Sequence, residues 1–431
     1  MTAEQRRARR AWCLYDWANS AFATVILAAV LPVYFAAIAP ADGIPLLGRT
    51  IPATAFWGYL VAASMLLVAM VAPAMGNLAD RHGLRKPLLI ACATGGALAT
   101  ALLVLAGRDA YLLTAALFLL GNVGFAAGNI FYNAFLPDLA RGADADRLSS
   151  QAYALGYLGG GIALALVFLL IEGHGALGLD KGTATRLGFL LTGIWWLLFA
   201  LPAFAWLREG PGCPDGHGLR HPGDYLRLAR ELAGYPDLLR FLAAFLLYND
   251  GIQTIIAIAA IFASVELGLS TGSILGCYLM IQFLAMPATL LTARLAIRFG
   301  AKATVIGTLA VFALITVYAA TMRTALEFWI LGLLVALVLG GSQALSRSLY
   351  TGLVPSQRSA EFFSFFAISS KFASILGPLL FAVLIDLTGS NRIAILALAL
   401  FFVAGIVLLA GVDLERGRER AGTGATGRQP G

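Results

Sequence analysis

The chain has 431 residues, of which 60% are hydrophobic and only 12% are charged, and its mean hydropathy is +0.83. Soluble domains carry about 25% charged residues, so this composition excludes an ordinary soluble domain and predicts that lipid is the solvent. In a soluble protein the net charge of +7 would suggest nucleic acid as a partner. Here the basic residues lie in short loops between apolar runs, where they set the orientation of a membrane protein. We therefore expect no nucleic-acid partner.

Twelve apolar runs follow one another along the chain, and about 20 apolar residues are enough to cross a bilayer as a helix. The runs are 12–38, 54–76, 87–106, 111–136, 151–171, 186–207, 238–264, 271–296, 302–322, 327–352, 361–387 and 391–411. They are continuous rather than alternating, which predicts helices and excludes a β-barrel. The sequence therefore predicts an all-α membrane protein with twelve transmembrane helices.

Most of the Lys and Arg residues fall at the N-terminus, in the connections that follow even-numbered runs, and in the C-terminal tail. By the positive-inside rule both termini are cytoplasmic, and we expect an inner-membrane protein. The longest polar segment, 208–237, has an amphipathic stretch around Tyr225–Leu232 and is predicted to be a cytoplasmic linker with a surface helix. It separates two six-helix bundles, 1–207 and 238–412, and the tail 413–431 is predicted to be disordered.

The four cysteines show no C-x-x-C spacing, and the four histidines all lie in predicted loops. We therefore expect no disulfide framework, no metal site and no cofactor. The sequence has neither a nucleophile–base motif nor a phosphate-binding glycine-rich motif, which argues against an enzyme and against an ATPase. A monomeric transporter driven by a gradient is the favoured interpretation. A non-transporting receptor or scaffold on the same fold is the alternative.

The first and seventh runs share a D-x-x-[NQ]-[ST] pattern, which indicates an internal duplication. The matched residues are Asp16, Asn19 and Ser20 in the first run and Asp250, Gln253 and Thr254 in the seventh. Positions i, i+3 and i+4 share one face of a helix, so each helix presents an acid, an amide and a hydroxyl in the same direction. This pattern predicts two parallel six-helix repeats around a polar cavity.

Four charged residues fall inside predicted helices, where a charge costs about 2.5–3.5 kcal/mol unless it faces a cavity or a partner. They are Lys371, Asp250, Arg347 and Asp16. A rise of about 1.5 Å per residue from Glu361 places Lys371 about 15 Å deep, near the midplane. Lys371 is predicted to bind an anionic group of the substrate or to titrate; the alternative is a permanent pair with Asp250. Asp250 is predicted to accept a proton or a substrate ammonium.

Other polar stripes leave two interpretations open. Asn129 and Asn133 share a face of the fourth run, and Asn129 occupies the position that matches Arg347 in the tenth. These amides either line the cavity or hold helices together by hydrogen bonds. Asp16 lies nearer the cytoplasmic end and either binds in the cavity or stays at its mouth. The glycines at 156 and 159–161 predict close helix packing or, alternatively, a flexible gate.

The connection between the second and third runs fits the signature G-x-x-x-D-R-x-G-x-[RK]-[RK] and resembles the corresponding loop of the major facilitator superfamily. The matched residues are Gly76, Asp80, Arg81, Gly83, Arg85 and Lys86. The resemblance implies a conformational latch, in which Asp80 and the bases form a charge network at the cytoplasmic ends of the two halves. Ordinary loop charges are the alternative.

Five further segments resemble the "unknown major facilitator" family, which is related to the autophagy-linked vacuolar amino-acid effluxers. They are 14–22, 153–161, 248–251, 341–348 and 361–378. The resemblance implies secondary transport of a small organic zwitterion or anion, with an amino acid as the leading substrate and export as the direction. Protons are the expected coupling ion. The long linkers of the vacuolar relatives are missing, so a role in autophagy does not carry over.

Overall fold

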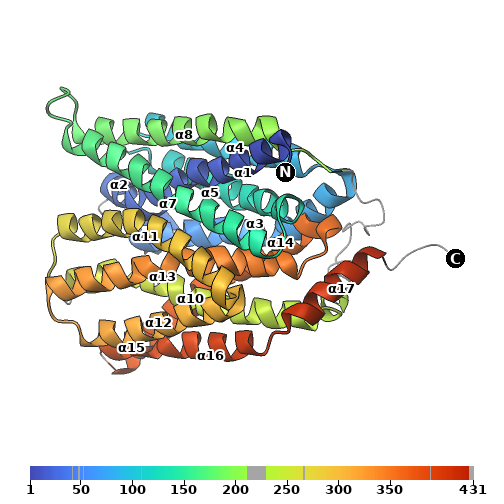
Figure 1. The fold of residues 1–431 in the computed structure, drawn as a ribbon. Helices are drawn as coiled ribbons and strands as arrows, with labels where there is room; N and C mark the ends of the chain where they lie inside the picture. Colours follow the sequence, from blue (N-terminus) through green and yellow to red (C-terminus); the bar gives the residue numbers. More distant parts are fainter. Residues whose placement is uncertain are drawn as a thin grey trace. The chain divides into compact units, whose positions relative to one another are not determined.

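A computed structural model describes residues 1–40, 42–46, 49–51, 53–107, 109–210, 230–265, 267–388 and 390–426. The chain is almost entirely helical (Figure 1). Its first helices are α1 (Ala3–Ala21), the π-helix η1 (Phe22–Ala29), α2 (Leu31–Ile38), α3 (Ala53–His82), α4 (Arg85–Leu102), the 3-10 turn η2 (Leu103–Leu105), α5 (Tyr111–Ala134), α6 (Leu136–Leu139), α7 (Ala143–Glu172) and α8 (Lys181–Trp206).

The later helices are α10 (Pro236–Val265), α11 (Thr271–Phe299), α12 (Ala301–Thr321), α13 (Ala325–Gly352), the 3-10 turn η3 (Ser356–Arg358), α14 (Ser359–Thr388), α15 (Asn391–Ala397), α16 (Ala399–Ala410) and α17 (Leu414–Thr426). Among the described residues, nine helices are long and apolar enough to span a membrane, or ten if the pair Ala3–Ala29 and Leu31–Ile38, bent by 42°, is one span. The helices α10 and α14 have 30 residues each and cover two further predicted runs. The all-α membrane fold is therefore confirmed.

Contacts between Cα atoms divide the chain into two compact units whose limits differ from the predicted bundles. The first unit comprises Met1–Ala72, Gly83–Asn133 and Leu155–Pro211. The second comprises Pro73–His82, Ala134–Ala154 and Gly212–Gly431. The second unit thus takes in the end of α3 and the beginning of α7, which the sequence assigns to the first bundle. The division into two sequence repeats, 1–207 and 238–412, therefore stays a prediction.

Within the first unit, α8 packs against α1 and α4. Trp17 of α1 stacks on Trp195 of α8, with their ring centroids 5.5 Å apart, and Phe199 meets Trp17 edge-on. A hairpin of two short antiparallel strands, β1 (Ile44–Leu46) and β2 (Arg49–Ile51), follows α2. The sequence does not predict this hairpin, in which Ile44 is buried beside Phe35.

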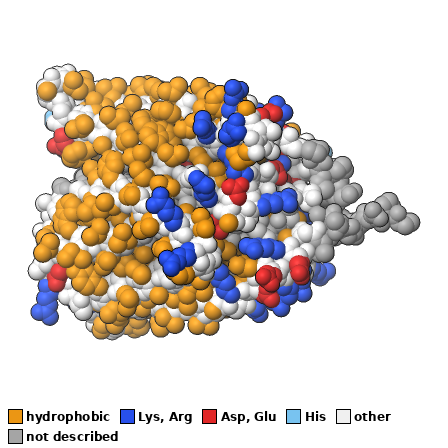
Figure 2. Space-filling view, in the orientation of Figure 1, with side chains coloured by type: hydrophobic (Ala, Val, Ile, Leu, Met, Phe, Trp, Pro, Cys, Tyr) orange, Lys and Arg blue, Asp and Glu red, His pale blue; other side chains and the backbone are white. Residues whose placement is uncertain are grey.

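Within the second unit, α10 packs against α14 and α16, and α13 packs against α11 and α12. Large apolar side chains such as Leu314, Leu400 and Val407 are more than half exposed, as expected for helices that face lipid. Figure 2 shows how extensively apolar side chains cover the visible face and how Lys and Arg gather in separate groups.

Part of the tail 413–431, which the sequence predicts to be disordered, forms the helix α17 over Leu414–Thr426, and the residues after it lie outside the described part of the chain. Asp413 accepts hydrogen bonds from the backbone N–H groups of Glu415 and Arg416, which starts the helix. Arg416 then donates through Nε and Nη2 to the two carboxylate oxygens of Asp237, at 2.6 and 2.7 Å. The predicted surface helix of the linker 208–237 lies largely outside the described residues.

Candidate functional site

The polar faces of α1 and α5 meet in the first unit. The side-chain amide of Asn19 donates to the side-chain oxygen Oδ1 of Asn129 at 2.7 Å. Asp16, one turn earlier on α1, is buried, with 9% of its surface exposed. Asn133 is half-buried one turn beyond Asn129. The bond between Asn19 and Asn129 favours the interpretation that these amides hold helices together.

Small residues in α7 allow α1 to approach closely. A Cβ atom at Gly156 would lie 2.7 Å from the Ser20 hydroxyl oxygen, and one at Gly159 would lie 2.7 Å from the Trp17 carbonyl oxygen. A Cβ atom at Gly160 would lie 2.5 Å from the Thr24 hydroxyl oxygen. These separations are shorter than real contacts, so the glycines serve packing, the first of the two predicted roles.

Arg347 of α13 binds the beginning of α7 within the second unit. Its Nε donates to the Ser149 hydroxyl at 2.8 Å, its Nη2 donates to the Ser149 carbonyl at 3.0 Å, and its guanidinium lies 4.3 Å from the centre of the Tyr153 ring. The next residue, Ser348, donates to the carboxylate of Asp146. Sequence reasoning missed this partner, although the polar pair Ser149–Ser150 at the start of a predicted helix marks the place.

The end of α3 contacts the beginning of α14 at a cluster that we name the α3–α14 junction, formed by Gly76, Asn77, Asp80, Ala360 and Glu361. The two carboxylate oxygens of Asp80 accept from the backbone N–H groups of Ala360 and Glu361, at 3.2 and 2.9 Å. The Asn77 amide donates to the Glu361 carboxylate at 3.4 Å. Because the N-terminus of a helix carries partial positive charge, it is a suitable partner for a buried carboxylate.

Arg358, which is not one of the predicted latch residues, and two of the latch residues, Arg85 and Lys86, have partners of their own. Arg358 donates to Glu361 at 2.7 Å and to Glu231 at 3.1 Å in the second unit. Arg85 donates to Glu209 at 3.1 Å in the first unit, and the Lys86 backbone N–H donates to the same carboxylate.

The six latch residues therefore belong to both units, with Gly76, Asp80 and Arg81 in the second and Gly83, Arg85 and Lys86 in the first. Gly83 has a φ of 64°, the left-handed conformation that ends a helix and favours glycine. The role of the six as a latch stays a prediction.

Asp250 is fully buried on α10, and no described side chain donates to its carboxylate. The backbone N–H of Gly377 on α14 faces this carboxylate without forming a hydrogen bond of good geometry. Thr254, one turn later, is also fully buried, and Gln253 is half-buried. Both Asp250 and Thr254 lie against Gly377 of α14, where a Cβ atom would be 3.1 Å from the Asp250 carboxylate and would overlap the Thr254 hydroxyl. The side chain of Lys371 lies outside the described residues, so its predicted pairing with Asp250 stays a prediction.

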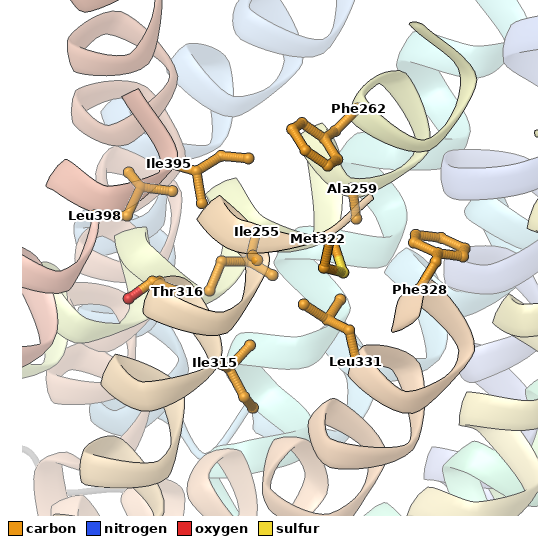
Figure 3. A pocket seen from close by; sticks show the side chains of 11 residues that line it. Ile255, Ala259, Phe262, Ile315, Thr316, Met322, Phe328, Leu331, Ile395 and Leu398 are labelled. Atoms are coloured by element: carbon orange, nitrogen blue, oxygen red, sulfur yellow. The ribbon is translucent and has the colours of Figure 1, made fainter. Parts of the chain in front are cut away.

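An apolar pocket lies elsewhere in the second unit, among α10, α12, α13 and α15 (Figure 3). Its lining is aliphatic and aromatic apart from Met322 and Thr316. The Thr316 hydroxyl already donates to the Ala313 carbonyl at 2.6 Å. The pocket therefore offers a zwitterion no polar partner and is not the predicted substrate site.

Relatives with known names match almost the whole chain. A family model described as "Vacuole effluxer Atg22 like" matches residues 4–422. An uncharacterised transporter of the major facilitator type, YxiO of Bacillus subtilis, is 34% identical over 412 residues, which are 94% of each chain. Autophagy-related protein 22 of Yarrowia lipolytica is 26% identical over 477 aligned residues, which cover 89% of this chain and 79% of that protein.

Solved structures share the fold. The human organic anion transporter MFSD10 has a TM-score of 0.74 at 18% identity and covers 95% of this chain and all of its own. The fucose:proton symporter FucP of E. coli has a TM-score of 0.71 at 15% identity, with 95% and 98% covered. These likenesses and the named relatives describe a transporter rather than an enzyme. The chain belongs to the Atg22-like vacuole effluxer family and has the fold of major facilitator transporters.

Proposed function

We propose that this protein is a secondary active transporter that exports a small organic zwitterion or anion, with an amino acid as the first candidate, by alternating access. The proposal places it in the cytoplasmic (inner) membrane with both termini in the cytoplasm, because basic residues concentrate in the segments on that side. The description of the family as effluxers supports export. The human organic anion transporter MFSD10, which shares the fold, supports an anionic group on the substrate.

The α3–α14 junction is the observation that carries alternating access. It joins a segment of the first predicted bundle to a helix of the second through two backbone hydrogen bonds to Asp80 and one from the Asn77 amide to Glu361. A net hydrogen bond contributes about 0.5–1.5 kcal/mol, and one to a charged group about 1.5–3 kcal/mol. A contact of this strength can close one end of a transport path and still be broken in each cycle, because rocking transitions involve differences of a few kcal/mol.

The substrate site of this proposal combines charges of both signs near the midplane. Lys371 binds the substrate's carboxylate, and Asp250 binds its ammonium group or the coupling ion, for which a proton is the candidate that the sequence suggests. Arg347 and Asp16 are secondary candidates. In the structure Arg347 binds Ser149, so within this proposal it acts chiefly by joining α13 to α7.

Purified protein in lipid vesicles tests the proposal directly. We expect accelerated exchange of at least one labelled amino acid or related anion across the vesicle membrane, and loss of that exchange in Lys371→Ala. Lys181→Ala is the matched control, because the Lys181 side chain is two-thirds exposed. Unchanged exchange in Lys371→Ala would remove this residue from the site. Absence of any flux would instead favour a receptor or scaffold built on a transporter fold.

A further inference from the structure

Thr254 is an exception among the buried threonines. In a membrane helix a threonine hydroxyl normally donates to a carbonyl of its own preceding turn. The other buried threonines of the described residues do this: Thr100, Thr114, Thr185, Thr192, Thr289, Thr292, Thr304, Thr308, Thr316 and Thr351. The Thr254 hydroxyl makes no hydrogen bond with the described residues, so its rotamer directs the oxygen away from its own helix.

Asp250 is a similar exception among the buried carboxylates. Asp80 accepts from backbone N–H groups, Asp146 accepts from Ser348, and Asp237 accepts from Arg416. Within the described part of the chain Asp250 has no such bond, because only the Gly377 backbone N–H faces it, and with poor geometry, although Asp250 is as buried as the other three. No described side chain supplies a positive charge beside Asp250, and a buried carboxylate is unfavourable unless its charge is compensated.

The two exceptions lie side by side. Asp250 and Thr254 are four residues apart on α10, which places them on one face, and both lie against Gly377 of α14. The residue after Gly377 is proline, which has no N–H, so the Ser374 carbonyl lacks the donor that a helix normally supplies. A carboxylate, a hydroxyl and a freed backbone carbonyl therefore belong to adjoining turns of two packed helices.

We propose that Asp250, Thr254 and the Ser374 carbonyl bind one Na⁺ ion. Hard cations take oxygen ligands, and carbonyls at helix breaks coordinate Na⁺ in membrane transporters. One carboxylate balances a single positive charge, which favours a monovalent over a divalent ion. The complete burial of Asp250 favours a compact ion over an organic ammonium group. If the protein is the proposed transporter, Na⁺ replaces the proton as its coupling ion. Only this coupling role rests on the proposed function, and the Na⁺ site itself does not.

The test is thermal unfolding of the purified protein in NaCl and in choline chloride at equal ionic strength. An ion that binds only the folded state raises the unfolding temperature, and we expect a rise on the order of 5 °C when Na⁺ is in large excess over its Kd. Thr254→Val keeps the shape but removes the hydroxyl, and Asp250→Asn removes the charge. Both variants should lose the response to Na⁺. Thr289→Val, whose hydroxyl only bonds to its own helix at Ala285, should keep it.

Several outcomes would overturn the proposal: equal stabilisation by NaCl and choline chloride, a full Na⁺ response in Thr254→Val, or a lost response in Thr289→Val. The measurement needs no substrate and so separates this inference from the proposed function. Vesicle flux that ignores Na⁺, with no thermal response to it, would refute the ion site and leave transport standing. A selective Na⁺ response without flux of any solute would refute transport and leave the ion site standing.

Discussion

Gly76 shows at the scale of one residue how tightly the α3–α14 junction is closed. A Cβ atom there would lie 2.6 Å from the Ala360 carbonyl oxygen and 2.8 Å from the Glu361 Cα atom, both of which are backbone atoms. Gly76→Val should therefore push α3 away from α14, at a cost of about 1–3 kcal/mol to the closed junction. We expect faster labelling of a cysteine placed at position 77 and reduced flux.

Gly95→Val is the matched control for this change. Gly95 also lies within a membrane helix, but a Cβ atom there would have nothing within 4 Å among its neighbours. Equal labelling at position 77 in both valine variants and the wild type would show that the junction does not depend on the glycine.

Arg347 allows charge and geometry to be separated. Arg347→Lys keeps the positive charge but cannot donate to the hydroxyl and the carbonyl of Ser149 at once while stacking on Tyr153. We expect a loss of flux of about tenfold or more, since hydrogen bonds from a charged group contribute about 1.5–3 kcal/mol each. Flux assays on vesicles measure this. Wild-type flux in the lysine variant would mean that only the charge of Arg347 matters.

The sequence predicts which residues carry charge into the membrane, but it does not predict their partners. Counting along a helix is enough to place Asp250 deep in the bilayer, because the rise per residue is constant. Which side chain meets Arg347 depends on how α7 packs against α13, and no periodicity encodes that. The backbone partners of Asp80 were equally inaccessible, because every residue has the same N–H group.

At the scale of an element, the buried acid Asp237 of α10 is the ion-pair partner of α17. The bidentate bond from Arg416, together with the Asp413 backbone N–H, holds the pKa of Asp237 at about 2, below its ordinary value of 3.8. The carboxylate therefore contributes stability above about pH 4, and that contribution is lost as the pH falls towards 2. Arg416→Ala should lower stability at neutral pH by up to about 1 kcal/mol, a modest value because the Arg416 side chain is half exposed.

The pH dependence distinguishes this bond from a general effect of charge. In Arg416→Ala the pKa of Asp237 moves back towards its ordinary value, so less stability is lost between about pH 4 and pH 2. Thermal unfolding in detergent as a function of pH measures the difference. Arg420→Ala, which removes a bond of 3.4 Å to the Gly234 carbonyl, should leave the acid response unchanged. A wild-type acid response in Arg416→Ala would contradict the assignment.

The spans themselves were predictable, since hydrocarbon forces every backbone group to bond within its own helix. Elements outside the bilayer were not. α17 is polar and rich in arginine, so its composition suggests disorder, and its order depends on Asp237 some 180 residues earlier. The π-helix η1 in the first span also escapes prediction, because its apolar residues suit an ordinary helix equally well.

At the scale of the whole molecule, the proposed alternating access predicts that the α3–α14 junction opens in every cycle. Cysteines at positions 77 and 361, whose native side chains are 3.4 Å apart, should be joined by a short cleavable thiol cross-linker in a chain without its native cysteines. We expect flux to fall to background while the link is intact and to recover when it is cleaved. Vesicle exchange before and after cleavage measures this, and full flux in the linked protein would exclude opening at this place.

The two-bundle organisation was predicted from the repeated acid–amide–hydroxyl pattern of the first and seventh runs. The division into compact units was not, because it depends on the contacts that the end of α3 makes with α14 and that the beginning of α7 makes with α13. A duplicated sequence pattern indicates that the chain consists of two related repeats. It carries no information about which conformation brings particular segments together.

The bond between Asp80 and α14 has a consequence for any mutational survey of this protein. Its two donors are main-chain groups, so replacing Ala360 or Glu361 by any amino acid other than proline leaves both donors in place. A conventional alanine scan along α14 would therefore not detect the contribution of the two backbone donors. It would attribute the whole effect of the contact to Asp80. A proline substitution or an amide-to-ester exchange at position 361, either of which removes the N–H donor, can probe the backbone half of the contact.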